Sequence, residues 1–390
     1  MNEDYEGIKM RKPGIFGTLY KYELLKIFKN RVAIVTFLIL FFYAFIQGEF
    51  EVRGNVTTEE LEQYRTLSGR EMDEEFISEI LAVTDDVGRI VDDSDVAYEE
   101  PAYWIMDVIG YGASFKDLNE EKIYHERELT IQEAHELACL TEEEESYWAE
   151  QENGIVKPII FHDTVVPSGV LEGTTNYMIM MVIIIETGLS SVFAMETQRK
   201  TDPMIRAALH GNKELYFAKM LAGMTYILGA IVVLLATFYT YIGIRWGFAG
   251  MDYAVQLYLP FSQMDLTNWQ LAGILVMLTI LGSLLISAFS LLISNITRNA
   301  LAAMAIVIGG HLALFAASTM VPYSMRGLSQ FLSLLPSTLV SSRLVYEYRL
   351  VKLGGFLRCY QMAPVLYILL IMAFIAVGYV FYDRYEIKSN

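Results

Sequence analysis

The sequence predicts an all-α polytopic membrane protein with a large polar domain between its first two membrane-spanning helices. Of 390 residues, 54% are hydrophobic and only 19% are charged, whereas a soluble domain is about a quarter charged. Residues 49–173 hold 33 of the 46 acidic residues but only 8 of the 29 basic ones. These figures exclude a single soluble domain, because the rest of the chain is strongly apolar and net basic. The sequence offers no basic patch for binding nucleic acid.

The first 31 residues are polar and basic, which predicts a cytoplasmic segment. Residues 17–31, GTLYKYELLKIFKNR, combine a rough apolar stripe with lysines beside it: Leu19, Tyr22, Leu25, Ile27 and Phe28, with Lys21, Lys26 and Lys29. This composition is typical of a helix that lies along a membrane surface. No small-residue cleavage site follows the first apolar run, so we expect that run to stay as a membrane anchor.

Six stretches are long and apolar enough to cross a bilayer, which takes roughly 17 to 25 such residues. They are residues 32–48, 173–195, 220–244, 269–296, 299–322 and 363–382. The fourth is expected to begin at Trp269, because aromatic residues favour the membrane interface. Lysine and arginine concentrate before the first stretch and between the second and third, which places both termini in the cytoplasm. We expect a multi-pass protein of a bacterial plasma membrane.

The charge of the segment between the fifth and sixth stretches disagrees with this topology. Residues 323–362 lie outside but are net basic, with five cations against one acid: Arg326, Arg343, Arg349, Lys352 and Arg358, against Glu347. We expect interfacial helices whose cations meet lipid headgroups or the acidic domain. The alternative is that the fifth stretch does not cross the membrane.

Residues 49–172 are expected to form an acidic, mainly helical extracellular domain. Thr57 with Glu60, and Thr141 with Glu144, have capping-box spacing, in which two side chains satisfy backbone N–H groups at a helix start. Residues 157–166 favour a strand. We interpret the acidity as a solvated surface, and a funnel that attracts cationic substrates is the alternative.

The sequence contains no evident catalytic, cofactor or metal site. It lacks a GxSxG nucleophile motif and a GxxxxGK[ST] phosphate loop, so any ATP must be bound by another subunit. His125, His135 and His162 have no metal-ligand spacing and are expected at the surface.

Two ionisable residues lie inside apolar stretches. Charged groups in a bilayer are costly and mark functional sites, so Glu186 and His311 are candidates for lining a substrate path. For Glu186 the alternative is a protonated or hydrogen-bonded carboxyl that faces neighbouring Ser, Thr or Tyr groups. For His311 it is a neutral ring packed beside Gly309 and Gly310.

The loop at residues 196–219 carries the most informative pattern. An acid at the end of the second span is followed by a threonine, a short apolar helix, a turn and a lysine that opens the third span: Glu196, Thr201, Met204, Ile205, Leu209, Gly211 and Lys219. We interpret the short helix as a lever pushed by a partner, and an ordinary interfacial turn is the alternative. In this order the loop resembles that of the type 2 permease family of ATP-binding cassette exporters. The glycine common before the threonine is Lys200 here.

The resemblance extends over nearly the whole chain outside the polar domain, because residues 17–31 match the elbow helix of the family and the plan of six spans agrees. It implies a pair of permease subunits, identical or sister, with two separate ATPase subunits that bind ATP and Mg. The chain itself then holds no cofactor and is not an enzyme. It also implies coupling or architectural roles for the loop residues named above, Glu196 to Lys219.

We therefore expect an export permease for an amphipathic substrate such as a peptide, an antimicrobial or a lipid. A membrane-anchored sensor or scaffold, whose acidic domain binds an extracellular ligand, is the alternative.

Overall fold

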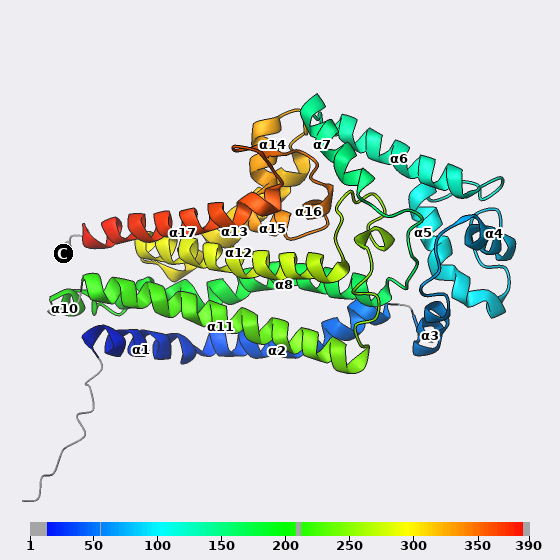
Figure 1. The fold of residues 1–390 in the computed structure, drawn as a ribbon. Coiled ribbons are helices and arrows are strands. Elements are labelled where there is room, and N and C mark those ends of the chain that lie inside the picture. Colours follow the sequence, from blue (N-terminus) through cyan, green and yellow to red (C-terminus); the bar gives the residue numbers. More distant parts are fainter. Residues whose placement is uncertain (1–13, 55, 208–211, 385–390) are drawn as a thin grey trace, which may run out of the picture.

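The computed structural model describes residues 14–54, 56–207 and 212–384. Within these ranges six helices are long and apolar enough to cross a membrane. They are α2 (Arg31–Arg53), α8 (Val165–Leu189) continued by α9 (Ser191–Gln198), α11 (Lys213–Arg245), α12 (Asn268–Thr297), α13 (Ala300–Met320) and α17 (Cys359–Asp383). They run alongside one another (Figure 1). The predicted all-α fold with six candidate spans is confirmed.

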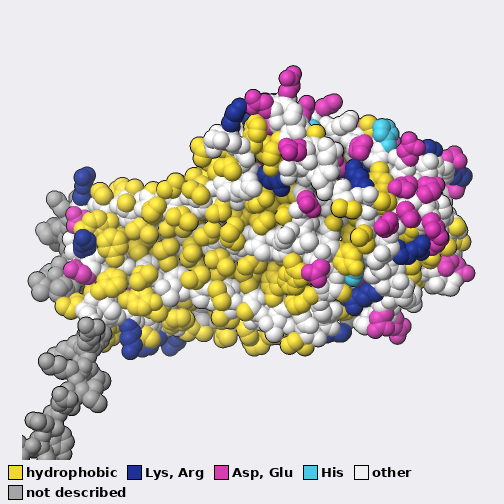
Figure 2. Space-filling model, viewed as in Figure 1, with side chains coloured by type: hydrophobic (Ala, Val, Ile, Leu, Met, Phe, Trp, Pro, Cys, Tyr) yellow, Lys and Arg dark blue, Asp and Glu magenta, His cyan; other side chains and the backbone are white. Residues whose placement is uncertain are grey.

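The molecular surface divides along the bundle. Figure 2 shows mostly hydrophobic side chains over the long helices and acidic side chains gathered at one end. The other end of the bundle carries the first helix, α1 (Ile15–Phe28), and, on its opposite side, the end of α17 (Figure 1). Asn212 Nδ2 there donates to Asp383 Oδ1 at 2.8 Å and joins the start of α11 to the end of α17.

Helix α8 begins earlier than expected. It starts at Val165 rather than at residue 173, so residues 165–172, which were expected to precede the span, are part of the same helix. The expected strand at residues 157–166 is also wrong, because only Ile160 forms an isolated bridge, with Glu71. Pro158 has no N–H to donate to a ladder, and Val165 is already helical.

Helices α2 and α8 approach closely near their polar-domain ends. A Cβ on Gly169 would lie 3.0 Å from Val52 Cα, so this contact requires glycine. One turn further into the bundle, the buried Gln47 side chain donates to the carbonyl of Gly173 at 3.1 Å. These contacts fix the helix pair on which the polar domain is mounted.

Helix α1 lies where the elbow helix was expected, and it buries only part of its apolar stripe. Glu23 and Ile27 are its buried residues and pack against the bundle. Tyr22, Leu25 and Phe28 are exposed by 64%, 40% and 52%. Part of the stripe therefore faces outward, as in an interfacial helix, while Ile27 packs on the bundle.

The polar domain is mainly helical. Its elements are α3 (Thr58–Thr66), α4 (Glu74–Val83), the 3₁₀ helix η1 (Asp93–Tyr98), α5 (Glu99–Ile109), α6 (Glu120–Leu137) and α7 (Glu142–Asn153). Both predicted capping boxes are confirmed, at the starts of α3 and α7. Phe76, Ile77, Ile105 and Phe161 lie in its buried core, and Leu257, from the segment after α11, lies there with them.

Two outer segments complete this domain. The first holds the 3₁₀ helix η2 (Val255–Leu257); the second holds α14 (Arg326–Ser333), α15 (Pro336–Leu339), α16 (Arg343–Tyr346) and the antiparallel pair β1 (Val351–Lys352) and β2 (Phe356–Leu357). The fully buried Arg127 of α6 donates to the carbonyls of Pro260 and Ser262 at 2.6 and 3.0 Å. Trp148 Nε1 donates to the carbonyl of Tyr348 at 2.5 Å.

Cations of the second outer segment contact the acidic domain. Lys352 pairs with Glu143 at 2.6 Å, and Arg326 pairs with Glu144. Arg349 is fully buried, and its Nε lies 2.6 Å from Glu347 Oε1. The positive charge that opposed the predicted topology is thus partly neutralised within the protein.

Candidate functional site

Three elements meet around the buried amine of Lys219, near the start of α11. Its Nζ lies 2.7 Å from Glu196 Oε1 on α9 and 3.2 Å from Glu23 Oε2 on α1. It also donates to the carbonyl of Val192 at 3.1 Å. Lys219, Glu23 and Glu196 are 0%, 4% and 7% exposed. A buried charge is tolerated only when it is paired, so this contact holds the three elements in one arrangement.

Lys26 balances the charge of this cluster. Its Nζ lies 2.5 Å from Glu23 Oε1 and 3.5 Å from Glu196 Oε1, and its side chain is half exposed. Partial burial lowers the pKa of Lys26, but Glu23 and Glu196 raise it more, so the net shift is upward. Two lysines thus face two carboxylates. We name these four residues the elbow–loop ion cluster.

Glu196 and Thr201, five residues apart, form a hydrogen bond that ends helix α9. Thr201 N donates to the carbonyl of Glu196 at 3.0 Å, and Lys200 N donates to that of Thr197 at 3.1 Å. These two bonds form a Schellman motif, whose central residue adopts the left-handed conformation. Lys200 has φ +56°. Glycine adopts this conformation without steric cost, whereas lysine does not.

A cavity of about 340 Å³ lies beside the ion cluster. Its walls come from α1, α9 and the short helix α10 (Asp202–Ala207), and they include Glu23, Lys26, Asn30, Glu196, Arg199, Thr201, Met204 and Ile205. Met204 is 79% exposed at the rim. The structure therefore brings Glu196, Thr201, Met204, Ile205 and Lys219 to one end of the bundle. Leu209 and Gly211 lie outside the described residues.

Glu186 lies on α8, away from the ion cluster. It is 0% exposed, and within the described chain neither carboxylate oxygen has a hydrogen-bond partner. It faces Ser290 of α12, whose hydroxyl is also buried without a partner. The carboxyl thus faces a neighbouring serine, as the alternative interpretation expected. An unpaired buried carboxyl is costly, so Glu186 stays a candidate for the path.

His311 lies on α13 and is half buried. A Cβ on Gly309 or Gly310 would meet nothing within 4 Å, so these glycines form no packed gap beside the ring. In the part of the chain that the structure describes, no hydrogen bond or ion pair joins His311 to Glu186. The two path candidates are thus not brought together.

The histidines of the polar domain were expected at the surface, and one is not. His125 is exposed, and the half-buried His135 hydrogen-bonds Gln263 Oε1 at 2.7 Å. His162 is buried, with Nδ1 3.0 Å from Asp163 Oδ2. Burial lowers the pKa of His162, but Asp163 raises it more. Among the residues described, no three His, Cys, Asp or Glu side chains are grouped to hold a metal ion.

Glu23 is the residue of this site that sequence reasoning missed. It is the only acid between residues 15 and 31, in a stretch otherwise rich in lysine and arginine. A single acidic residue on an otherwise basic helix could have indicated Glu23, because such a residue suggests an ion pair with a specific cation.

Comparison with known proteins identifies one matching protein family. A family model described as "ABC-2 family transporter protein" matches residues 18–387, nearly the whole chain. No curated protein and no solved structure matches the chain.

Proposed function

The chain belongs to the ABC-2 family of transporter proteins and is a transmembrane subunit of an ATP-binding cassette transporter. From this we propose that it is an export permease driven by separate ATPase subunits. The ATPases bind ATP and Mg, and they dock at the end of the bundle that carries α1 and α10. That end is cytoplasmic in this proposal, and the polar domain is extracellular.

The elbow–loop ion cluster is the observation that supports this proposal. Lys219 is buried between Glu23 and Glu196, so a push on α10 is passed to α1 and α11 as well as to α9. If α10 were joined to the bundle only by exposed residues, a force on α10 would move that helix without moving α1 and α11. Buried pairs have few alternative arrangements, which makes the three elements move together.

Helix α9 supplies the connection to the membrane interior. It follows α8 directly, and the two form one span from Val165 to Gln198. Glu186 therefore lies on the same rod as Glu196, ten residues further into the bundle. A tilt of this rod changes the surroundings of Glu186. The proposed substrate is amphipathic, such as a peptide, an antimicrobial or a lipid, and it passes between two permease subunits, identical or sister.

The proposal is tested by purifying the tagged chain from its own host in mild detergent and identifying co-eluting proteins by mass spectrometry. An ATPase subunit in near-equal amount is the expected result, and ATP hydrolysis by that complex in vesicles should respond to candidate amphipathic substrates. Reproducible absence of an ATPase would contradict the proposal. Ligand binding at the acidic domain without transport would then favour a sensor.

A further inference from the structure

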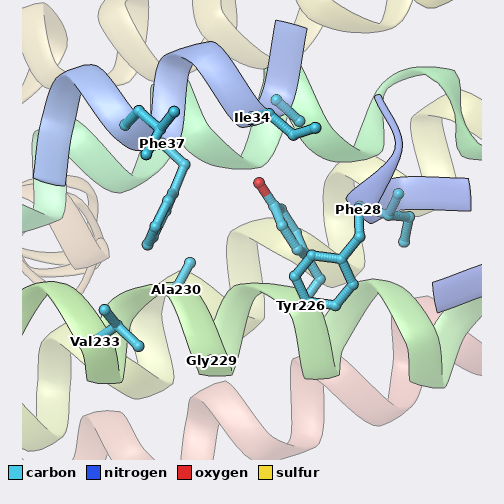
Figure 3. Close-up of a pocket in the computed structure, with 10 residues that line it drawn as sticks. Phe28, Ile34, Phe37, Tyr226, Gly229, Ala230 and Val233 are labelled. Atoms are coloured by element: carbon cyan, nitrogen blue, oxygen red, sulfur yellow. The ribbon is translucent and has the colours of Figure 1, made fainter. Parts of the chain in front are cut away.

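A second cavity, of about 420 Å³, lies on the side of the bundle between α1, α2 and α11 (Figure 3). Its walls are almost entirely apolar and include Ile27, Phe28, Ile34, Phe37 and Val233. We call it the lateral groove. Helices α2 and α11 are candidate spans, so the groove faces the membrane and is separate from the cavity beside the ion cluster.

The lateral groove contains one polar atom that lacks a partner. Figure 3 shows the hydroxyl of Tyr226 pointing across the groove towards α2, between Ile34 and Phe37. Tyr226 is 6% exposed, and within the described residues its hydroxyl has no hydrogen-bond partner. Its ring is held by an edge contact with Phe28 at 5.5 Å and by close packing on Gly188. An unpaired buried hydroxyl is costly, and a bound acceptor would remove this cost.

Two cations stand in the turn that joins the two groove-lining helices α1 and α2. Lys29 and Arg31 flank the turn between α1 and α2, and both are exposed. Neither forms an ion pair with another described residue. The turn is fixed, since Asn30 Nδ2 donates to the carbonyl of Thr187 at 3.1 Å and its Oδ1 caps α2. Basic residues at this level of a membrane attract anionic headgroups.

We propose that the lateral groove binds one acyl chain of an anionic phospholipid. The chain lies along Phe37 and Val233, an ester oxygen accepts the hydrogen bond of Tyr226, and the phosphate meets Lys29 and Arg31. The spacing suits this arrangement, because Ile34, beside the hydroxyl, is three residues or about 4.5 Å along the helix from Arg31. The phosphate and the ester oxygens of a phospholipid are separated on the same scale.

The test is native mass spectrometry of the full chain, purified in mild detergent and incubated with phosphatidylglycerol or with phosphatidylcholine of the same acyl chains. Gly229 lines the groove, and a Cβ there meets nothing within 4 Å, so Gly229→Leu fills the space without a clash. Gly273 of α12 is also exposed and open, and it lies outside the groove, so Gly273→Leu is the matched control.

The wild-type chain and Gly273→Leu are expected to retain one phosphatidylglycerol, and Gly229→Leu is expected to retain it at least tenfold less. Tyr226→Phe should weaken retention about fivefold, the effect of one hydrogen bond. Replacing Lys29 and Arg31 with glutamine should abolish the preference over phosphatidylcholine. Equal retention by Gly229→Leu and wild type would overturn the proposal. So would loss of a dimer instead of lipid in Gly229→Leu, which would assign the groove to a second copy of the chain.

Discussion

Replacing Lys219 with methionine should loosen the end of the bundle that carries α1 and α10. Methionine keeps the length and burial of the side chain but removes the charge between Glu23 and Glu196. Those two carboxylates would then be left with Lys26 alone, whose side chain is half exposed. The expected result is a loss of folding stability together with a loss of coupling between α1, α9 and α11.

The size of the effect follows from the contacts of Lys219. At distances of 2.7 and 3.2 Å, each attraction amounts to about 5 to 6 kcal/mol at an effective dielectric constant of about 20. Desolvation of the charges offsets most of this. Breaking a buried pair costs about 3 to 5 kcal/mol, and because Lys26 still neutralises one carboxylate we expect about 3 kcal/mol. Because the unfolding entropy grows with chain length, for 390 residues that corresponds to a fall in Tm of about 4 °C.

Thiol reactivity during heating provides the assay. Cys359 is buried at the start of α17 and becomes reactive when the bundle opens, and Cys139→Ser in every variant removes the exposed thiol. Lys21→Met is the control, because Lys21 lies on α1 but is exposed. Adding Glu196→Gln to Lys219→Met should recover part of the loss, since one unpaired charge is removed. A Tm of Lys219→Met within about 2 °C of wild type would refute the reasoning.

Three further predictions concern other parts of the chain. Met204→Asp should abolish stimulation of the partner ATPase by substrate while stability changes by less than about 0.5 kcal/mol, because Met204 is 79% exposed; retained stimulation in vesicles would argue against α10 as the lever. Lys200→Gly should stabilise the chain by about 1 kcal/mol, since it relieves a left-handed residue, and an unchanged or lower Tm would show that no strain is present. Burial raises the pKa of Glu144, but the hydrogen bonds from Arg326, Thr141 and the backbone of Leu350 together lower it more, so its folded pKa lies below the usual 4.5. Its stabilisation is therefore present above about pH 4.5 and is lost as the pH falls through the folded pKa; Tm measured between about pH 7 and pH 3 should fall more for wild type than for Glu144→Gln, and parallel curves would contradict this.

The sequence predicted those parts of the fold that depend on neighbouring residues. The six spans follow from uninterrupted apolar runs, and the two capping boxes follow from side chains three positions apart. The composite nature of the polar domain was not predictable. Leu257 joins its core, and Arg127 bonds the carbonyl of Pro260 across 133 positions. Such contacts leave no periodic pattern in the sequence.

The candidate site also has residues that the sequence predicted and residues that it did not. The loop pattern identified Glu196, Thr201 and Lys219, and the structure groups them. Glu23, 196 positions before Lys219, was missed because no residue near it in the sequence indicates the distant lysine that it pairs with. The Schellman bonds show that residue 200 is in a left-handed conformation that favours glycine, and nothing in the structure explains why lysine stands there.

The most direct test of the central claim is a photo-crosslinker placed at Met204 in the full chain in its own host. Met320, 81% exposed at the end of α13 towards the polar domain, is a matched control for Met204, 79% exposed on α10. After illumination, the account predicts an adduct between an ATPase subunit and the Met204 position, and none with the Met320 position. An ATPase adduct at Met320, or none at Met204 while the protein is folded, would contradict the account.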